Sequence, residues 1–576
     1  MDRRLLWAIA LMMLIAIAPS LLFKSQPGRG PSGAPSRVTP GQTDSLKRSA
    51  PPAVAGAPVS GAPPSTPGGS AAPPSEDTVE VSSDLYSYRF STRGGRLIGA
   101  TMRQYQSLAI GEAGHPAELL TPGHALSGLT LVAGADSLPI TDWAFTPSAR
   151  QLTVPSSPKG GVAQPAALRL TADRGPTKVE LTYTFLPDQY SIGVSGRIQG
   201  IGPNGGMLLL GLGSGIRNTE HDSVDNDRAL GLVTKDRESH VTLFGGLKPG
   251  ELTTLSGPFE WVAVKSKYFV VAALTLDTTV ARISGVTATA LPTGERHRSA
   301  AAVHLSLPVG PDGGFRYELY TGPMEFHRLA RIGHDFDDVN PYGWPGFRTV
   351  IRFFAAPVRW LLVTLHTRLH LAYGVVLILF GVMVRLILWP LNQKAMRASM
   401  QMQVVQPLLK EIQERYKNDP QKLNQEMFKL YREHKVNPLG GCWPMLLPFP
   451  VLLALFVVFQ YSIELRGTPF LWLPDLSRAD PLYILPVVMG LSMFALSKVG
   501  QLGMEPNPQM KMMLYVMPVM MTVLFLNFAC GLNLYYAVSN LVSIPQQWFL
   551  AKERLKRIPP PAPPPAPKPA PKPSKK

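Results

Sequence analysis

Residues 371–391 read LAYGVVLILFGVMVRLILWPL and contain one charged residue, Arg385. A helix rises 1.5 Å per residue, so a run of this length can cross the roughly 30 Å hydrocarbon core of a bilayer. Other apolar runs lie at residues 5–23, 442–461, 482–496, 512–530 and 532–550. The sequence therefore predicts a polytopic α-helical membrane protein with six transmembrane helices, five of which form a C-terminal core.

Composition agrees with this class. The 576 residues carry 56 Lys and Arg against 39 Asp and Glu, a net charge of +17, but only 16% of residues are charged, against about 25% in soluble domains. A nucleic-acid-binding protein of this basicity would carry more total charge. Two cysteines exclude a disulfide-stapled secreted fold.

The first apolar run resembles a targeting segment. Arg3 and Arg4 precede it, and it exceeds the roughly 7–15 apolar residues of a cleavable signal peptide. Residues 16–18 (AIA) offer a cleavage site, but Pro19 follows them directly. We therefore expect an uncleaved signal anchor, with cleavage as the alternative.

Residues 26–76 are rich in Pro, Gly, Ser and Ala and are expected to form a linker, because they hold too little apolar surface to offset the entropy of ordering. The pattern then changes to short runs of β type. Residues 179–185 (VELTYTF) alternate with period two, and residues 85–90 (LYSYRF) precede a turn at Gly94 and Gly95. Runs of this kind, without long helical stretches, predict a large all-β sandwich at 77–335.

The β region shows no catalytic signature. It lacks G-x-S-x-G, a P-loop, H-E-x-x-H and a cysteine metal site. Its one dense polar cluster, residues 220–227 (EHDSVDND), does not have the ligand spacing of a calcium loop. We expect a solvated loop there, a binding or scaffolding role for the domain, and neither a metal, a cofactor nor a catalytic residue.

Lys and Arg in the short loops predict the orientation. The stretch 392–440 contains nine of them and the tail from 552 contains eight, whereas residues 462–481 contain only Arg466 and Arg478. With six spans, both termini lie in the cytoplasm and the β domain lies outside.

Two further segments flank the first core span. Residues 347–369 are apolar but include several Arg and His, a composition that we interpret as too charged to span and suited to a helix in the interface plane. Downstream, Asp419-Pro420 fits a helix N-cap followed by Pro at the first helical position. Apolar residues at helical spacing on both sides of it predict a helical hairpin.

Several motifs occur in order along the C-terminal part: Arg385 in a span, then residues 437–442 (NPLGGC), 464–466 (ELR), 480–486 (DPLYILP), 517–518 (MP) and 531–536 (GLNLYY). In this respect the chain resembles the bacterial YidC-type membrane insertases of the YidC/Oxa/Alb family, over roughly 335–555. Residues 92–95 (TRGG) and 261–263 (WVA) resemble the periplasmic domain of the Gram-negative form more weakly.

The resemblance implies an inner-membrane protein with a periplasmic β domain. The expected segments are a signal-anchor helix at 1–25, a linker at 26–76, the β-sandwich at 77–335, an interfacial helix at 336–370, a span at 371–391, a cytoplasmic hairpin at 392–440, spans at 441–462, 482–500, 511–530 and 532–551, and a basic Pro/Lys-rich tail at 552–576.

The resemblance also implies an activity, partners and a site. The activity is insertion and folding of membrane proteins, alone or with the Sec translocon (SecYEG, SecDF). Nascent membrane proteins are the implied substrates, and we expect the hairpin and basic tail to meet the ribosome or anionic lipids. Arg385 is the expected charge of a hydrophilic groove, lined by Gln460, Thr522, Asn527, Asn533, Ser539 and Asn540, with Phe449, Pro450, Tyr535 and Tyr536 contacting the substrate helix.

The sequence leaves three alternatives open, one for the role of Arg385 and two for the class of protein. Arg385 lies only about 9 Å from the cytoplasmic end of its run, so its side chain could simply reach the interface as an anchor. A transporter or channel would need internal repeats and intramembrane carboxylates, and the core spans contain no Asp or Glu. A binding protein merely anchored in the membrane would need one span rather than six.

Overall fold

The computed structural model describes residues 77–134, 136–156, 164–277, 281–292, 299–340, 348–417, 419–434, 449–503 and 508–557. The predicted signal anchor, the linker and most of the tail lie outside these residues. The chain forms two compact units. One unit is mostly β and contains most of the described residues up to Thr321. The other is mostly helical and contains the residues from Gly322 onward together with two short segments, Ile110–Gly114 and Lys267–Val270.

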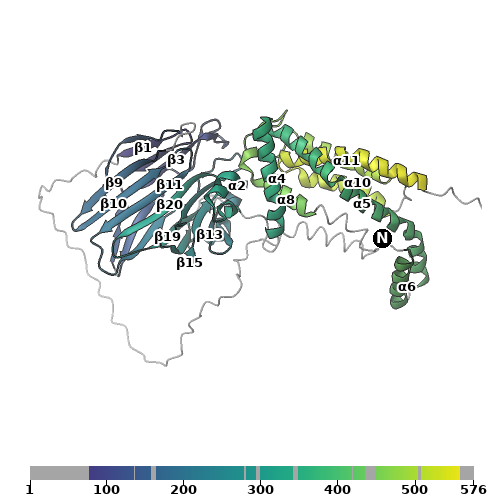
Figure 1. Ribbon diagram of the computed structural model, residues 1–576, viewed down its shortest axis with the longest axis horizontal. Helices are drawn as coiled ribbons and strands as arrows, with labels where there is room; N and C mark the ends of the chain where they lie inside the picture. Colours follow the sequence, from purple (N-terminus) through teal and green to yellow (C-terminus); the bar gives the residue numbers. More distant parts are fainter. Residues whose placement is uncertain are drawn as a thin grey trace, which may run out of the picture. The chain divides into compact units, whose positions relative to one another are not determined.

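The β unit contains three sheets (Figure 1). A five-stranded sheet has the order β4 (Pro116–Glu118), β3 (Leu97–Gln106), β2 (Tyr86–Ser91), β1 (Thr78–Ser82) and β8 (Gln151–Thr153). A nine-stranded sheet has the order β14 (Ser239–Leu243), β13 (Gly231–Lys235), β16 (Trp261–Lys265), β17 (Phe269–Leu274), β20 (Gly314–Pro323), β11 (Ser191–Gln199), β10 (Thr177–Phe185), β9 (Ala166–Arg174) and β7 (Thr146–Pro147). A six-stranded sheet has the order β15 (Leu252–Phe259), β18 (Ile283–Ala290), β19 (Ala301–Val309), β12 (Gly206–Gly211), β5 (Gly128–Ala133) and β6 (Asp136–Pro139).

These sheets confirm the predicted β-sandwich. The alternating residues 179–185 form β10, which pairs antiparallel with both β9 and β11 and buries every second side chain. The predicted turn after β2 is present. Gly94 and Gly95 both have positive φ, at 76° and 62°, a conformation that other residues rarely adopt.

Aromatic side chains fill the space between the five-stranded and nine-stranded sheets. The ring of Phe90 on β2 lies 4.7 Å from that of Tyr183 and 6.0 Å from that of Phe185, both on β10. Two buried phenols find backbone acceptors: Tyr88 donates to the Thr321 carbonyl and Tyr183 to the Gly95 carbonyl, each at 2.8 Å. Burial raises the pKa of Tyr86 to about 12 from its ordinary value of 10.0, so this phenol stays uncharged even in mildly alkaline solution.

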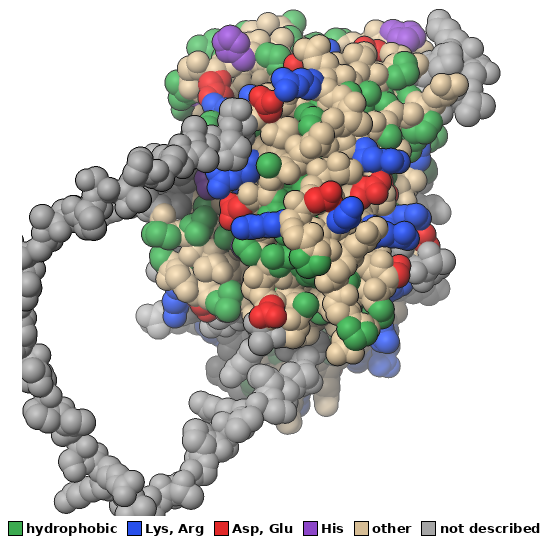
Figure 2. Space-filling view, turned by 90° about the vertical axis from the view of Figure 1, so that its left-hand side faces the viewer, with side chains coloured by type: hydrophobic (Ala, Val, Ile, Leu, Met, Phe, Trp, Pro, Cys, Tyr) green, Lys and Arg blue, Asp and Glu red, His purple; other side chains and the backbone are tan. Residues whose placement is uncertain are grey.

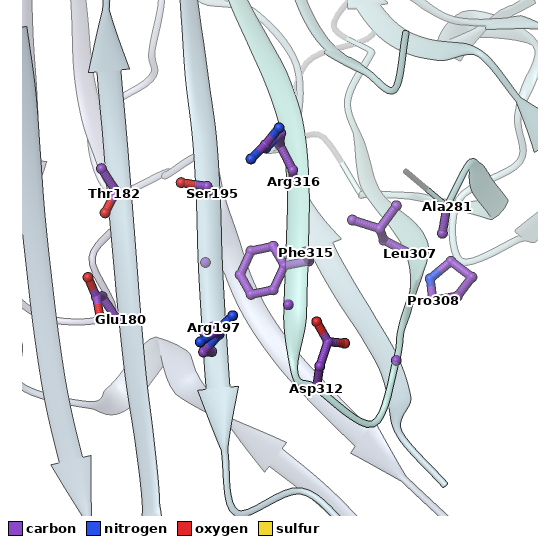
Figure 3. Close-up of a pocket in the computed structure, with 13 residues that line it drawn as sticks. Glu180, Thr182, Ser195, Arg197, Ala281, Leu307, Pro308, Asp312, Phe315 and Arg316 are labelled. Carbon is purple, nitrogen blue, oxygen red and sulfur yellow. The ribbon is translucent and has the colours of Figure 1, made fainter. Parts of the chain in front are cut away.

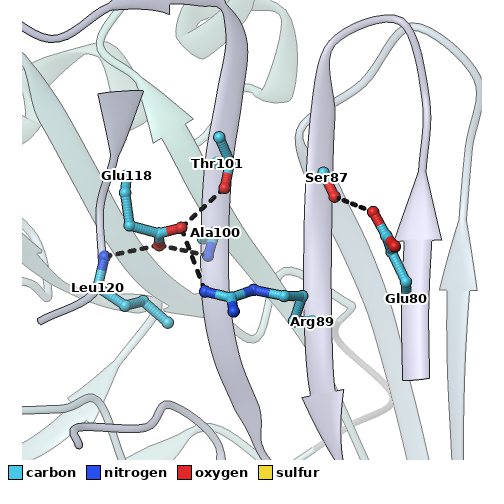
Figure 4. A network of polar contacts seen from close by, with 7 residues as sticks. All are labelled: Glu80, Ser87, Arg89, Ala100, Thr101, Glu118 and Leu120. Atoms are coloured by element: carbon cyan, nitrogen blue, oxygen red, sulfur yellow. Dashed lines mark hydrogen bonds and ion pairs between the residues drawn. The ribbon is translucent and has the colours of Figure 1, made fainter. Parts of the chain in front are cut away.

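The polar contacts of Glu118 join neighbouring strands of the β unit and stabilise its fold. Glu118 accepts hydrogen bonds from the backbone N–H of Ala100 and the hydroxyl of Thr101, both at 2.7 Å, and lies 3.7 Å from Arg89 (Figure 4). Figure 2 shows basic and acidic side chains next to one another across one face of the molecule. A mixed surface of this kind is not a phosphate-binding patch.

The polar cluster at 220–227 differs from the prediction of a solvated loop. A short helix, α2 (Ser223–Ala229), forms there, because the Asp222 carboxylate accepts the Asp225 N–H at 3.0 Å and caps it. Glu220 is buried and accepts from the Thr219 hydroxyl. Within the described residues, no group of three His, Cys, Asp or Glu side chains is placed to hold a metal ion.

The helical unit contains, in order, α3 (Phe326–Ile332), α4 (Arg348–Leu369), α5 (Tyr373–Arg415), α6 (Pro420–Glu433), α8 (Phe449–Tyr461), α9 (Ile484–Gly500), α10 (Pro508–Phe525) and α11 (Cys530–Arg557) (Figure 1). Helix α11 packs against α5 and α9, α10 packs against α9, and α4 packs against α8 and α5. Phe380, Phe459 and Tyr535 lie at the centre of the resulting apolar core.

The first core span does not end where its apolar run ends. Helix α5 continues without interruption from Tyr373 to Arg415, so the first arm of the predicted hairpin is an extension of the span. Residues 392–397 (NQKAMR) end the hydrophobic run but retain helix-forming side chains. Asp419 caps α6 as predicted, accepting the Lys422 N–H at 3.1 Å, and Leu430 packs on Val405 between the two arms.

Two of the described helices are long and apolar enough to cross a membrane: Arg348–Leu369 and Tyr373–Gln393. Shorter apolar helices lie at Val451–Tyr461, Ile484–Gly500 and Met510–Phe525. By length and composition alone α4 meets the same criterion as α5, so its charges do not by themselves exclude a span, and the interfacial position of α4 stays a prediction. Its basic residues are far enough apart that an 18-residue window retains a mean hydropathy of 1.2.

Candidate functional site

The polar face of α11 is built by sequence spacing. Ser539, Ser543 and Gln546 recur at i, i+4 and i+7, so they share one side of the helix, and all three are buried. That side faces α5, since the Gln546 amide donates to the Trp389 carbonyl at 3.2 Å. Hydroxyl and amide groups on membrane helices often find partners on neighbouring helices, as Ser539 and Gln546 do.

Arg385 on α5 joins this face. Its Nε donates to the Ser539 hydroxyl oxygen at 2.7 Å, across the contact between α5 and α11. Ser543 in turn donates to the backbone carbonyl of Ser539 at 2.7 Å. In the part of the chain that the structure describes, Arg385 makes no ion pair. The partner of its side chain there is the neutral hydroxyl of Ser539.

A second polar contact lies on the α9 side of α11. The Asn540 amide donates to the hydroxyl of Ser492 at 3.2 Å, and both side chains are buried. We call Arg385, Ser492, Ser539, Asn540, Ser543 and Gln546 the polar seam. The sequence prediction contained Arg385, Ser539 and Asn540. It missed Ser492, Ser543 and Gln546. Ser543 and Gln546 lie four and seven residues after Ser539, a spacing that predicts the same face of the helix.

Aromatic rings lie next to the seam. Tyr535 is one turn before Ser539 and is buried, with its ring centre 5.7 Å from Phe380 and 6.0 Å from Phe459. The Tyr536 ring lies 5.6 Å from that of Tyr535 and 5.2 Å from that of Phe525. The expected substrate contacts Tyr535 and Tyr536 therefore pack in the aromatic core, one turn before Ser539 on the same helix. Phe449 and Pro450 begin α8, but their side chains lie outside the described part of the structure.

Four residues expected in the groove lie outside the polar seam. The buried Asn533 donates to the Phe525 and Phe528 carbonyls, at 3.1 and 3.4 Å, and thus closes the turn between α10 and α11. Thr522 bonds the Pro518 carbonyl of its own helix at 2.8 Å. Asn527 is exposed in the same turn. Gln460 is half-buried on α8, and among the described contacts no hydrogen bond joins it to the seam.

The β unit offers a competing site, a hollow of about 670 Å³ over strands β10, β11 and β20 (Figure 3). Thr182, Ser195, Arg197 and Arg316 border it. The carboxylate of Glu180 pairs with Arg169 at 3.1 Å, and Arg316 approaches Asp277 at 4.0 Å. Two of the bordering charges, Glu180 and Arg316, thus already interact within the protein, whereas the charge of Arg385 on α5 has only a neutral partner among the described residues.

Comparison with known proteins covers both units. Residues 78–361 match a family model described as the YidC periplasmic domain, and residues 364–557 match one described as a 60Kd inner membrane protein. The chain is similar to proteins named membrane protein insertase YidC from Geobacter sp. strain M21, at 32% identity covering 82% of this chain and 85% of that protein, and from Oleidesulfovibrio alaskensis, at 30% identity covering 96% and 99%. Among solved structures it is similar to an active YidC insertase with its first transmembrane domain resolved, at 18% identity and a TM-score of 0.32, covering 82% of this chain and 93% of that one.

Proposed function

This chain belongs to the YidC family of membrane protein insertases, and we propose that it inserts its substrates through a hydrophilic groove centred on Arg385. The observation that carries this proposal is the hydrogen bond from Arg385 to Ser539, which orients a half-buried charge without neutralising it. A charge inside a membrane helix costs about 2.5–3.5 kcal/mol on insertion scales, and such charges are commonly functional.

The groove acts on the polar part of a substrate. A nascent membrane protein carries a hydrophilic, often acidic, segment ahead of its apolar span, and the unpaired guanidinium draws that segment into the seam. The apolar span follows beside Tyr535 and Tyr536 and leaves toward lipid. Burial of apolar surface, at about 25 cal/mol per Å², supplies the driving force, so the mechanism requires no covalent step.

We propose that the chain crosses the membrane six times, with both termini in the cytoplasm and the β unit in the periplasm. The excess of Lys and Arg in 392–440 and in the tail supports this orientation. The shorter apolar helices α8, α9 and α10 complete the core around α5 and α11. Helix α4 then lies along the membrane interface at the start of the core, where its basic residues can reach water.

Reconstitution tests the insertase against a transporter or channel. Purified protein in liposomes should insert a short one-span or two-span substrate without permitting flux of small solutes. Solute flux in the absence of insertion would contradict the proposed function. Crosslinks from positions beside Ser539 to ribosome-stalled nascent chains would place the substrate at the seam, and crosslinks only at the outer surface would contradict the groove.

The cytoplasmic partners follow from charge. We propose that the hairpin and tail contact the ribosome or anionic lipid head groups. Cooperation of this core with the Sec translocon (SecYEG, SecDF) is proposed from membership of the family and not from charge. Phosphate contacts by Lys and Arg weaken with salt. Deletion of residues 559–576 should therefore reduce co-sedimentation with ribosomes at low salt. Unchanged co-sedimentation would reject the ribosomal contact and leave the lipid contact.

A further inference from the structure

The loop between α8 and α9 contains a tight hairpin with an apolar tip. Phe470 and Leu473 form an antiparallel bridge in which each backbone N–H donates to the other residue's carbonyl at 2.9 Å. The two residues between them, Leu471 and Trp472, are 77% and 39% exposed. Turn positions usually carry small or polar residues, so a Leu-Trp tip needs an explanation.

The backbone conformation at this tip is one that leucine rarely adopts. Leu471 has φ +55°, in the left-handed region that is rare for side chains other than those of Gly, Asn and Asp. At this first central position of a two-residue hairpin, the turn with positive φ usually has glycine. The fold alone would therefore favour glycine here. The leucine contributes a large side chain that is directed outward.

The hairpin is held at one end of the apolar span. The ring of Phe470 lies against Gly374 in the first turn of α5, where a side chain at position 374 would overlap it. Leu473 is buried in the helical core. Since the apolar part of α5 begins at Tyr373, the tip lies at the level where the hydrocarbon core gives way to the head-group region.

One buried carboxylate fixes a second apolar projection beside the tip. Asp480 is fully buried and accepts hydrogen bonds from the backbone N–H of Leu485 at 2.7 Å and of Leu482 at 3.0 Å, and from the Trp472 indole at 3.4 Å. Leu482 and Tyr483 are nevertheless 61% and 52% exposed, and Tyr483 also has φ +55°. The same carboxylate thus connects the tip to the start of α9.

We propose that Leu471, Trp472, Leu482 and Tyr483, here called the apolar tip, insert into the interfacial region of the periplasmic leaflet. Trp and Tyr favour this region because each combines an apolar ring with one polar N–H or O–H group that needs a hydrogen-bond partner. The Trp472 N–H has that partner in Asp480. The tip is continuous with the exposed apolar side of α9, including Val487 and Leu491, which faces lipid in the proposed topology. Lipid is therefore the occupant that this surface fits, and the inference depends on that topology.

The tip also gives the loop a function. A rigid hairpin attached to α5 and α9 keeps the periplasmic ends of both helices at a fixed depth while the cytoplasmic side admits substrate. Depth is set by the side chains at the tip, and rigidity is set by Asp480. Loss of the tip should therefore change the position of these helices in the bilayer without removing the charge at the seam.

Nitroxide accessibility tests this inference in the full-length protein reconstituted in liposomes. The label is attached at Leu471→Cys in a chain with Cys442→Ala and Cys530→Ala. Leu491→Cys, exposed on α9, is the lipid control, and Gln425→Cys, exposed on α6, is the water control. The Leu471 label should resemble the α9 control, with several-fold higher accessibility to oxygen than to a water-soluble nickel chelate.

Two outcomes would overturn the inference. Nickel accessibility equal to that at Gln425→Cys would place the tip in water. Protection from both reagents would place it against protein, either the β unit or a second copy. Substrate insertion measured on the same vesicles distinguishes this failure from failure of the proposed function, since lipid contact at Leu471 does not depend on insertion activity.

Discussion

At Gly490, helix α9 has no room for a side chain, because a Cβ atom would overlap the hydroxyl of Thr522 on α10. The hydroxyl is not free to move, since it bonds the Pro518 carbonyl. Gly490→Ala should therefore destabilise the protein by about 1–3 kcal/mol, as overpacking typically does. Thermal unfolding in detergent would measure this loss. Thr522→Ala should recover part of it in the double variant, and equal stability of the single and double variants would contradict the contact.

Lys265 on β16 is buried, and burial lowers its pKa to about 8 from an ordinary value of 10.5. The folded state disfavours the charged ammonium, so stability is present above pH 10.5 and is lost as the pH falls toward 8. The free energy of unfolding should rise between pH 8 and 10, by at most about 3 kcal/mol. Urea unfolding followed by intrinsic fluorescence would show the rise. It should be smaller in Lys265→Met, and an unchanged pH dependence in this variant would assign the rise to other groups.

Residue-level prediction from sequence is most specific where chemistry leaves few choices. Arg385 stood out as a charge in a span, and its partner Ser539 was among the polar residues predicted with it. Asn533 failed as a groove residue because the same amide also suits a helix turn, and it bonds the Phe525 carbonyl there. Polarity shows that a buried side chain needs a partner. The partner itself depends on helix rotation, which the sequence leaves open.

At the scale of elements, the capped helix α6 provides a direct test. The Asp419 carboxylate accepts the Lys422 N–H, one of the amide groups that a helix leaves unpaired. Asp419→Ala should destabilise α6 by about 1 kcal/mol. Amide hydrogen exchange of the first turn would then accelerate several-fold. The control Gln421→Ala, at an exposed position, should not accelerate it, and equal effects of the two variants would contradict the cap.

Element boundaries were harder to predict than element types. The apolar run that predicts the first core span ends near Leu391, whereas α5 continues to Arg415. Hydrophobicity marks the membrane boundary and helix propensity marks the helix, so the two need not end together. The strands were clearer, because the period-two pattern of β10 directly reflects one buried face.

At the scale of the whole molecule, the core helices are short for a membrane. Helix α9 has 17 residues and α10 has 18, or about 25–27 Å against a hydrocarbon core of about 30 Å. A short span can be accommodated by local thinning of the bilayer. We expect a thinner bilayer beside α9 and α10, which shortens the path for a polar substrate segment. Cryo-electron microscopy in nanodiscs would measure the distance between head-group layers, and uniform thickness around the protein would contradict this expectation.

The central claim is that the unpaired charge of Arg385 draws polar substrate segments into the membrane. The direct measurement is the insertion rate, in proteoliposomes, of a one-span substrate with an acidic leading segment and of a matched substrate with a neutral one. Arg385→Lys should retain insertion. Ser539→Ala, which keeps the charge but removes its hydrogen-bond partner, should give a partial loss.

Arg385→Ala should slow the acidic substrate about tenfold, equivalent to about 1.4 kcal/mol of lost stabilisation, and slow the neutral substrate less. The difference between the two substrates is the decisive quantity, because a general folding defect would slow both equally. If Arg385→Ala inserts the acidic substrate at the wild-type rate, Arg385 is only an anchor that reaches the membrane surface, and the proposed groove mechanism is wrong.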